Sequence, residues 1–170
     1  MNDNALPVPV DPAEFRRVVG RFATGVTIVS TVVDGVDHAM TVNAFTSVSL
    51  EPLLVLFCAE KIARFHDAVL RSGQWAVSVL PENAQELSTW FATRGRPLGD
   101  GRLSEPPFKR GPMTGAPILT EAVATLECRT HAVHEGGDHS IIVGEVLAVD
   151  TPDLDARPLL FYEGRYRTVE

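Results

Sequence analysis

Apolar positions along the chain change their spacing several times, and each change marks a predicted element. From residue 15 to 22 they recur at helical spacing, after Asp11, whose side chain can cap a helix, and before Gly25, which is expected to end it. The run 26–33 is almost entirely β-branched, as is typical of a strand. The Asp-Gly pair at 34–35 is typical of a hairpin turn. The first part of the chain therefore predicts a helix followed by a β-hairpin.

The same reasoning predicts further short strands and helices along the rest of the chain. The strands are expected at 38–45, 53–58, 75–80, 123–134, 139–149, 158–162 and 165–169. The helices are expected at 62–72 and 83–91. The run 53–58 is continuously apolar, which favours a strand buried on both faces, whereas 75–80 alternates. Residues 94–117 are rich in glycine and proline without a period, and they predict a long surface loop.

Many strands and few helices indicate a mostly β fold with flanking helices, arranged as an antiparallel barrel. Strands and helices do not alternate regularly, so a parallel doubly wound sheet is not expected. The usual phosphate-binding and hydrolase motifs are also missing from the sequence. A dinucleotide, if bound, must be held in some other way than in a Rossmann fold.

Length and charge narrow the class of protein. The chain has 170 residues and a net charge of −7. We interpret residues 1–10 as a flexible arm and residues 11–170 as a single domain. The acidic balance argues against a nucleic-acid partner. No apolar run approaches the roughly 20 residues that cross a bilayer, and the start of the chain lacks a secretion signal. We therefore expect a cytoplasmic protein with no membrane partner.

Cysteines and histidines are the first candidates for chemistry. Cys58 and Cys128 each lie among strand-forming residues, which favours buried free thiols over a disulfide. His131 and His134 lie near a third histidine, but residues three apart on a strand point to opposite faces, so we expect no metal site. His139 follows a flexible Gly-Gly-Asp and begins an apolar strand. It is the histidine that we retain as a functional candidate.

The stretch 40–52 mixes hydroxyl and amide side chains with strand-forming residues, just before the apolar run at 53–58. Hydroxyls, an amide and free backbone N–H groups can hold a phosphate or the polar edge of a flavin without a large positive charge. An edge strand whose polar side chains face water would give the same pattern. The residues alone leave both interpretations open.

Four blocks in a fixed order give the chain a resemblance to a known family. They are residues 22–27, residues 40–52 with the pattern T-x-N-x-F-T-S-V-S-L-x-P, the Gly-Asp-His of 137–139 with 143–146, and 158–166. The sequence resembles the flavin reductase-like domain family, the short-chain reductase components of two-component flavin monooxygenases. The blocks span nearly the whole chain.

This resemblance implies a split β-barrel of the FMN-binding type that forms a homodimer, with the flavin in a groove near the subunit interface. It implies an NAD(P)H:flavin oxidoreductase that transfers hydride from NADH, or NADPH, to FAD or FMN and supplies the reduced flavin to a partner monooxygenase. Alternatives on a similar barrel are a tight FMN electron-transfer protein, an oxidase of the pyridoxamine-phosphate type and a non-catalytic flavin or haem carrier.

The resemblance also implies which residues bind the cofactors. The flavin is expected to contact His38, Ala39, Met40, Thr41, Asn43, Ala44, Cys58, Ala59, Glu60, Lys61, Arg64 and Phe65. His139 is expected beside the nicotinamide as the catalytic residue, with Tyr162, Arg165 and Tyr166 as further candidates whose alternative is strand packing. Ala63 and Arg64 stand where relatives often have hydroxyl residues, so Arg64 is the expected phosphate partner.

Overall fold

The computed structural model describes residues 9–98, 102–103 and 107–169. Most of the predicted arm, residues 1–8, lies outside the described residues. The helices are α1 (Pro12–Val19), α2 (Arg64–Ser72) and α3 (Gln85–Ala92). The strands are β1 (Thr24–Gly25), β2 (Thr27–Val33), β3 (Val36–Val42), β4 (Phe45–Leu50), β5 (Leu53–Glu60), β6 (Gln74–Val79), β7 (Phe108–Arg110), β8 (Pro117–Leu119), β9 (Ala124–Gly136), β10 (His139–Asp150), β11 (Leu160–Tyr162) and β12 (Arg165–Arg167).

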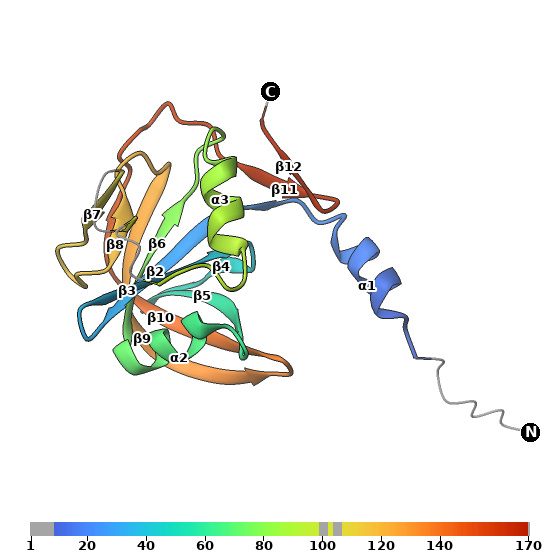
Figure 1. Ribbon diagram of the computed structural model, residues 1–170, viewed down its shortest axis with the longest axis horizontal. Helices are drawn as coiled ribbons and strands as arrows, with labels where there is room; N and C mark the ends of the chain where they lie inside the picture. Colours follow the sequence, from blue (N-terminus) through green and yellow to red (C-terminus); the bar gives the residue numbers. More distant parts are fainter. Residues whose placement is uncertain (1–8, 99–101, 104–106, 170) are drawn as a thin grey trace, which may run out of the picture.

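One large antiparallel sheet organises the molecule, in the strand order β3-β2-β6-β9-β10-β5-β4. The long β9–β10 hairpin forms its centre, and α2 and α3 flank it (Figure 1). Two small sheets, β1-β11-β12 and β7-β8, complete the described strands. The prediction of a mostly β, antiparallel fold with flanking helices is therefore confirmed.

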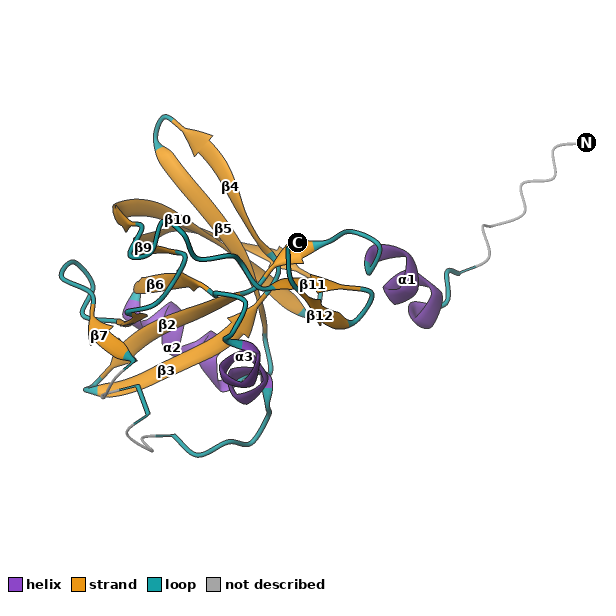
Figure 2. Cartoon of the chain, turned by 90° about the horizontal axis from the view of Figure 1, so that it is seen from above, coloured by secondary structure: helices purple, strands orange, loops and turns teal. Residues whose placement is uncertain are grey.

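The two edges of the large sheet are joined by a very short connection. β3 and β4 lie at opposite ends of the strand order, yet only residues 43 and 44 separate them in sequence. Strands lie about 4.8 Å apart, so a flat sheet of this order would be far wider than two residues can span. The sheet must therefore curl strongly, and Figure 2 shows β3 and β5 on opposite sides of the curved layer. The N–H of Cys58 donates to the carbonyl of Ala44 at 3.1 Å, which ties the connection to β5.

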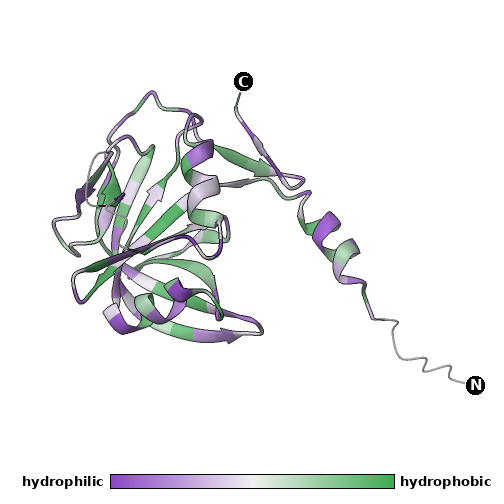
Figure 3. Cartoon of the chain, in the orientation of Figure 1, coloured by the Kyte–Doolittle hydropathy of each residue, from purple (hydrophilic) through white to green (hydrophobic). Residues whose placement is uncertain are grey.

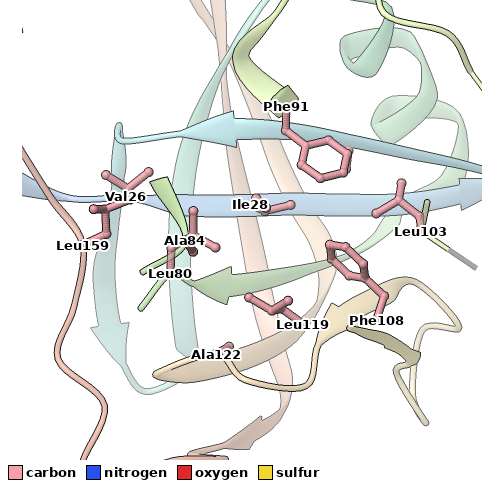
Figure 4. Packing of buried hydrophobic residues seen from close by; sticks show 11 residues of the cluster. Val26, Ile28, Leu80, Ala84, Phe91, Leu103, Phe108, Leu119, Ala122 and Leu159 are labelled. Atoms are coloured by element: carbon pink, nitrogen blue, oxygen red, sulfur yellow. The ribbon is translucent and has the colours of Figure 1, made fainter. Parts of the chain in front are cut away.

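The interior is filled from both faces of this curved sheet. One cluster contains residues of α3 and β8, and Figure 4 shows Phe91 and Phe108 pointing toward each other within it, with Ile28 on strand β2 nearby. The second cluster is built around Trp75 and Phe57, both fully buried, whose rings meet edge to face at 4.8 Å. These aromatic contacts fix the positions of β5 and β6.

A glycine of β10 allows the tightest contact in the second cluster. A Cβ built on Gly144 would overlap Cζ2 of Trp75 and lie 2.9 Å from Cη2 of the same ring. It would also lie 3.1 Å from Cβ of Cys128. The pairing of β10 with β9 shifts register at Val143/Gly144. The ring of Trp75 therefore occupies the space that any side chain at 144 would need.

Several predicted boundaries were wrong, for local reasons. The first helix ends at Val19, followed by Gly20 as its C-cap, whose N–H donates to the carbonyl of Arg16. Gly25, where the helix was expected to end, lies in β1. The strand expected at 38–45 is two strands, because the chain changes sheet edge at 43–44. The loop 94–117 contains β7 and the first residue of β8.

Burial along two strands also differs from the prediction. β5 alternates, with Phe57 fully buried and Leu53 52% exposed, so it is buried on one face only. β6 is instead buried on both faces from Trp75 to Ser78. β6 lies inside the sheet between β2 and β9 and is also contacted by β8, whereas β5 pairs with the edge strand β4.

Helix α1 stands apart from the rest of the molecule. It has no buried residue, and Figures 1 and 3 show it projecting beyond the β11–β12 hairpin. Phe15, Val18 and Val19 on this helix are each about half exposed or more, at 59%, 56% and 49%. A bond from the N–H of Glu163 to the carbonyl of Gly20, at 2.8 Å, holds its end near the hairpin. Within the described residues no helix is long and apolar enough to cross a bilayer.

Candidate functional site

Segments that are distant in sequence enclose a cavity of about 420 Å³ between β3, the start of α2 and the segment after α3. Its lining residues are His38, Ala39, Met40, Thr41, Val42, Asn43, Ala44, Cys58, Glu60, Ile62, Ala63, Arg64, Phe65, Phe91, Ala92, Thr93, Arg94, Gly95, Arg96, Leu98 and His139. This volume is within the range of small-molecule and cofactor pockets.

One wall of the cavity is an edge strand. β3 pairs with β2 on one side only, so the backbone N–H and C=O groups of its other edge face the cavity. One of them, the carbonyl of Ala39, accepts a hydrogen bond from Arg96. Thr41 is held in place by α3, because its hydroxyl donates to the carbonyl of Ser88 in that helix at 2.7 Å. This wall offers a fixed row of backbone donors and acceptors to a planar, polar-edged ligand.

The opposite wall contains the N-terminus of α2. Ala63 occupies the N-cap position and makes no side-chain cap hydrogen bond, so the first N–H groups of the helix are not satisfied from there. A helix N-terminus carries partial positive charge and binds phosphate groups. Arg64 adds a full charge at the same position, and its guanidinium donates to the carbonyl of Arg96. The start of α2 therefore offers an anion position at the cavity.

A short segment after α3 closes the cavity with two arginines. Arg94 forms an ion pair with Glu60 in which one guanidinium nitrogen, Nη2, lies 2.7 Å from each of the two carboxylate oxygens. The guanidinium of Arg96 lies over the ring of Phe91, 5.1 Å from its centroid. Segments 93–98 and 60–64 therefore face each other across the cavity, and polar contacts join them.

His139 reaches the cavity from the start of β10, where it is the ladder partner of Glu60. Its Nδ1 lies 2.7 Å from Oδ1 of Asp138. A carboxylate can only accept, so Nδ1 donates the proton, and in the neutral ring Nε2 is left as an acceptor. The hydrogen bond from His139 lowers the pKa of Asp138, and the positive charge of the imidazole lowers it further when that ring is protonated. The imidazole is thus oriented by its neighbour.

Two titratable groups of the cavity wall are held in their neutral forms. Burial lowers the pKa of His38, and the positive charge of Arg64 lowers it further. The Nδ1 atom of His38 is buried and has no hydrogen-bond partner among the residues that the structure describes. Burial also raises the pKa of the Cys58 thiol, which therefore stays protonated at neutral pH.

The structure brings most of the predicted site residues together at this cavity. Those that line it are His38, Ala39, Met40, Thr41, Asn43, Ala44, Cys58, Glu60, Arg64, Phe65 and His139. Those that do not line it are Ala59, Lys61, Tyr162, Arg165 and Tyr166.

The second group makes other contacts. Ala59 points into the core and is fully buried. The ammonium of Lys61 pairs with Glu135. The hydroxyl of Tyr166 lies 2.9 Å from the hydroxyl of Ser88, the residue whose carbonyl holds Thr41, so Tyr166 reaches the cavity wall only indirectly.

The sequence reasoning missed the segment 93–98. Its arginines, Arg94 and Arg96, were assigned to a surface loop because that region has no period and is rich in glycine. A possible signal was the clustering of these two cations in an acidic chain. Within the described part of the chain, no group of three or more metal-ligating side chains is gathered at one place.

The curved antiparallel sheet and its polar cavity with several arginines have the features of a small-molecule-binding protein whose ligand is planar and anionic. Comparison with known proteins identifies the family. Residues 19–170 match the flavin reductase like domain, and the chain belongs to that family.

Its relatives include reductase components of flavin-dependent enzymes. It is 40% identical over 161 residues to the reductase subunit HsaB of a flavin-dependent monooxygenase from Rhodococcus jostii, covering 95% of this chain and 80% of the relative. It is 42% identical over 160 residues to an NADH-dependent FAD reductase from Streptomyces globisporus, covering 94% and 86%. The crystal structure of BorF, the flavin reductase component of a bacterial two-component tryptophan halogenase, superposes with a TM-score of 0.89 at 39% identity, covering 94% and 98%.

Proposed function

We propose that this protein is an NAD(P)H:flavin oxidoreductase that reduces FAD or FMN with NADH and delivers the reduced flavin to a flavin-dependent monooxygenase. The observation that carries the proposal is the cavity between the free edge of β3 and the uncapped start of α2. An edge strand suits the alternating N–H and C=O groups of the flavin ring, and a helix N-terminus suits the phosphate of its tail. Family membership over residues 19–170 supports the same function.

The residues of the chain bind and orient, because the redox chemistry belongs to the two substrates. The nicotinamide supplies a hydride and the flavin ring accepts it. The backbone of β3 would hold the edge of the flavin ring, and the start of α2 with Arg64 would hold its phosphate. Because Nδ1 of His139 donates to Asp138, Nε2 would be available to accept a hydrogen bond from the carboxamide of a bound nicotinamide and so help to orient it.

A homodimer with a split-barrel fold is the assembly that we propose. The short connection at 43–44 draws the sheet edges toward each other, as a barrel requires. The apolar residues Phe15, Val18 and Val19 are exposed on α1 in the single chain, and a second copy would cover them. Phe15→Glu is expected to shift the protein from dimer to monomer in sedimentation velocity experiments. An unaltered protein that sediments as a monomer would contradict the proposed homodimer.

We also propose that the reductase works in the cytoplasm, where NADH is available.

NADH oxidation measured at 340 nm tests the function directly. Purified protein is mixed with NADH and, in turn, riboflavin, FMN and FAD. Loss of NADH absorbance that depends on added flavin is expected. A carrier that has lost catalysis would bind flavin without consuming NADH. A tight FMN protein would retain its flavin through dialysis and need none added.

A further inference from the structure

The ion pair between Arg94 and Glu60 is unusual because both partners line the same cavity. Glu60 ends β5 and Arg94 lies in the segment after α3, so the pair crosses from one wall to the other. Arg94 is 74% exposed in its side chain and Glu60 is 29% exposed. Exposed pairs of this kind contribute little to stability, so a ligand can replace one partner at small cost.

The cavity contains two separate positive positions. The first is the start of α2 with Arg64, which suits a single phosphate. The second is Arg94, whose Nη2 already donates to both oxygens of a carboxylate. A phosphate group also presents several negatively charged oxygens that a guanidinium can bind. The carboxylate of Glu60 therefore occupies the position that a second phosphate would take.

We propose that Arg94 binds the second phosphate of a dinucleotide pyrophosphate and that Glu60 is its exchangeable partner when no dinucleotide is bound. The inference rests on the proposed flavin reductase function and deepens it. A mononucleotide such as FMN has one phosphate and leaves the Arg94–Glu60 pair intact. Two ligands carry the required chemistry, FAD and NADH, because each contains a pyrophosphate.

Binding constants for riboflavin, FMN and FAD, measured by fluorescence quenching without NADH, test the FAD arm. Arg94→Ala is expected to weaken FAD binding about tenfold while FMN and riboflavin stay within about twofold, since one hydrogen bond between charged groups is lost. Arg94→Lys is expected to recover part of that loss, because it restores the charge without the fork. Glu60→Gln is expected to tighten FAD binding several-fold, and to have no effect when combined with Arg94→Ala.

Steady-state kinetics with FMN as acceptor test the NADH arm. If Arg94 serves NADH, Arg94→Ala raises the KM for NADH about tenfold, leaves the KM for reduced nicotinamide mononucleotide unchanged and leaves FAD affinity unchanged. Arg157→Ala is the matched control, because Arg157 pairs with Glu82 at 2.7 Å with similar exposures of 57% and 28% and neither residue lines this cavity.

The outcomes separate the two proposals. A selective effect on FAD or on NADH supports the role of Arg94. Equal weakening of FMN and FAD, or changes below about twofold in both arms, would overturn that role alone. Failure of the unaltered protein to bind any of the three flavins would overturn the flavin reductase function as well.

Discussion

The fit of Trp75 against Gly144 leads to a prediction that can be worked out in detail. An ordinary carbon–carbon contact is about 3.5–4.0 Å. In Gly144→Ala the new Cβ would overlap Cζ2 of Trp75 and approach Cη2 to 2.9 Å, so the ring must move. Trp75 is fully buried and packed edge to face on Phe57. Its indole N–H also donates to the hydroxyl of Thr130 at 3.2 Å, so its movement would disturb several contacts.

Two limits set the expected magnitude. Overpacking a core with an extra methyl group usually costs about 1–3 kcal/mol. Losing the packing of a large aromatic side chain costs about 3–5 kcal/mol. Because the added atom meets an immobile ring, we expect Gly144→Ala to lower the free energy of unfolding by about 3 kcal/mol, where these ranges meet. For a chain of this length, that corresponds to a fall in Tm of roughly 6–12 °C.

Equilibrium unfolding in urea, followed by circular dichroism, measures the change. The midpoint is expected to fall with an unchanged slope, which indicates lost stability without a changed unfolded state. Gly25→Ala is the control, since a Cβ there would meet nothing within 4 Å. Combining Gly144→Ala with Trp75→Phe should cost less than the sum of the two single changes, because the smaller ring leaves room. A Gly144→Ala protein within about 0.5 kcal/mol of the unaltered one would refute the reasoning.

Three further predictions concern single polar side chains. His139→Ala is expected to raise the KM for NADH about tenfold with little change in flavin affinity, since one hydrogen bond to a charged or polar partner is lost; an unchanged KM would remove His139 from the nicotinamide site. Because the pKa of His38 is lowered in the folded protein, the unfolded chain takes up a proton at this residue at a higher pH than the folded chain does. The contribution of neutral His38 to stability is therefore complete above about pH 6.5 and is lost as the pH falls through the lowered pKa. His38→Gln should therefore flatten the dependence of urea midpoints on pH below 6.5, and parallel curves would contradict this assignment. Glu127 is buried, and its Oε2 accepts from Met113 N at 3.0 Å and from the N–H and hydroxyl of Thr114 at 2.7 Å, so Glu127→Gln should cost about 1–3 kcal/mol in the same assay, with a cost near zero as the contrary result.

Local turn chemistry explains why much of the fold could be predicted. Asp34 and Gly35 adopt positive φ angles of 52° and 77°, as the predicted hairpin turn between β2 and β3 requires. Glu163 and Gly164 do the same between β11 and β12, with φ angles of 50° and 73°. In both hairpins a few adjacent residues determine the conformation, so the sequence pattern alone is informative.

The features that the sequence did not reveal depend on contacts between distant segments. The break at 43–44 arises because the chain moves from one sheet edge to the other, and nothing in the local pattern of polar and apolar residues marks that change. The positions of Arg94 and Arg96 at the cavity depend on contacts with Glu60 and Ala39, which lie more than 30 residues earlier. Most of the cavity lining outside this segment was assigned only through the resemblance to a family. Composition and periodicity by themselves left open the interpretation that this is an edge strand facing water.

The connection at 43–44 has a consequence for engineering this scaffold. Two residues act as a tether between strands that a seven-stranded layer would otherwise hold far apart. Insertions into loops usually cost little stability, but a longer connection here would let the edge strands β3 and β4 move apart and would widen the cavity. A circular permutant with its new termini at 43–44 would show how much of the curvature of the sheet is maintained by packing alone. New termini at the β4–β5 turn would leave the cavity unchanged.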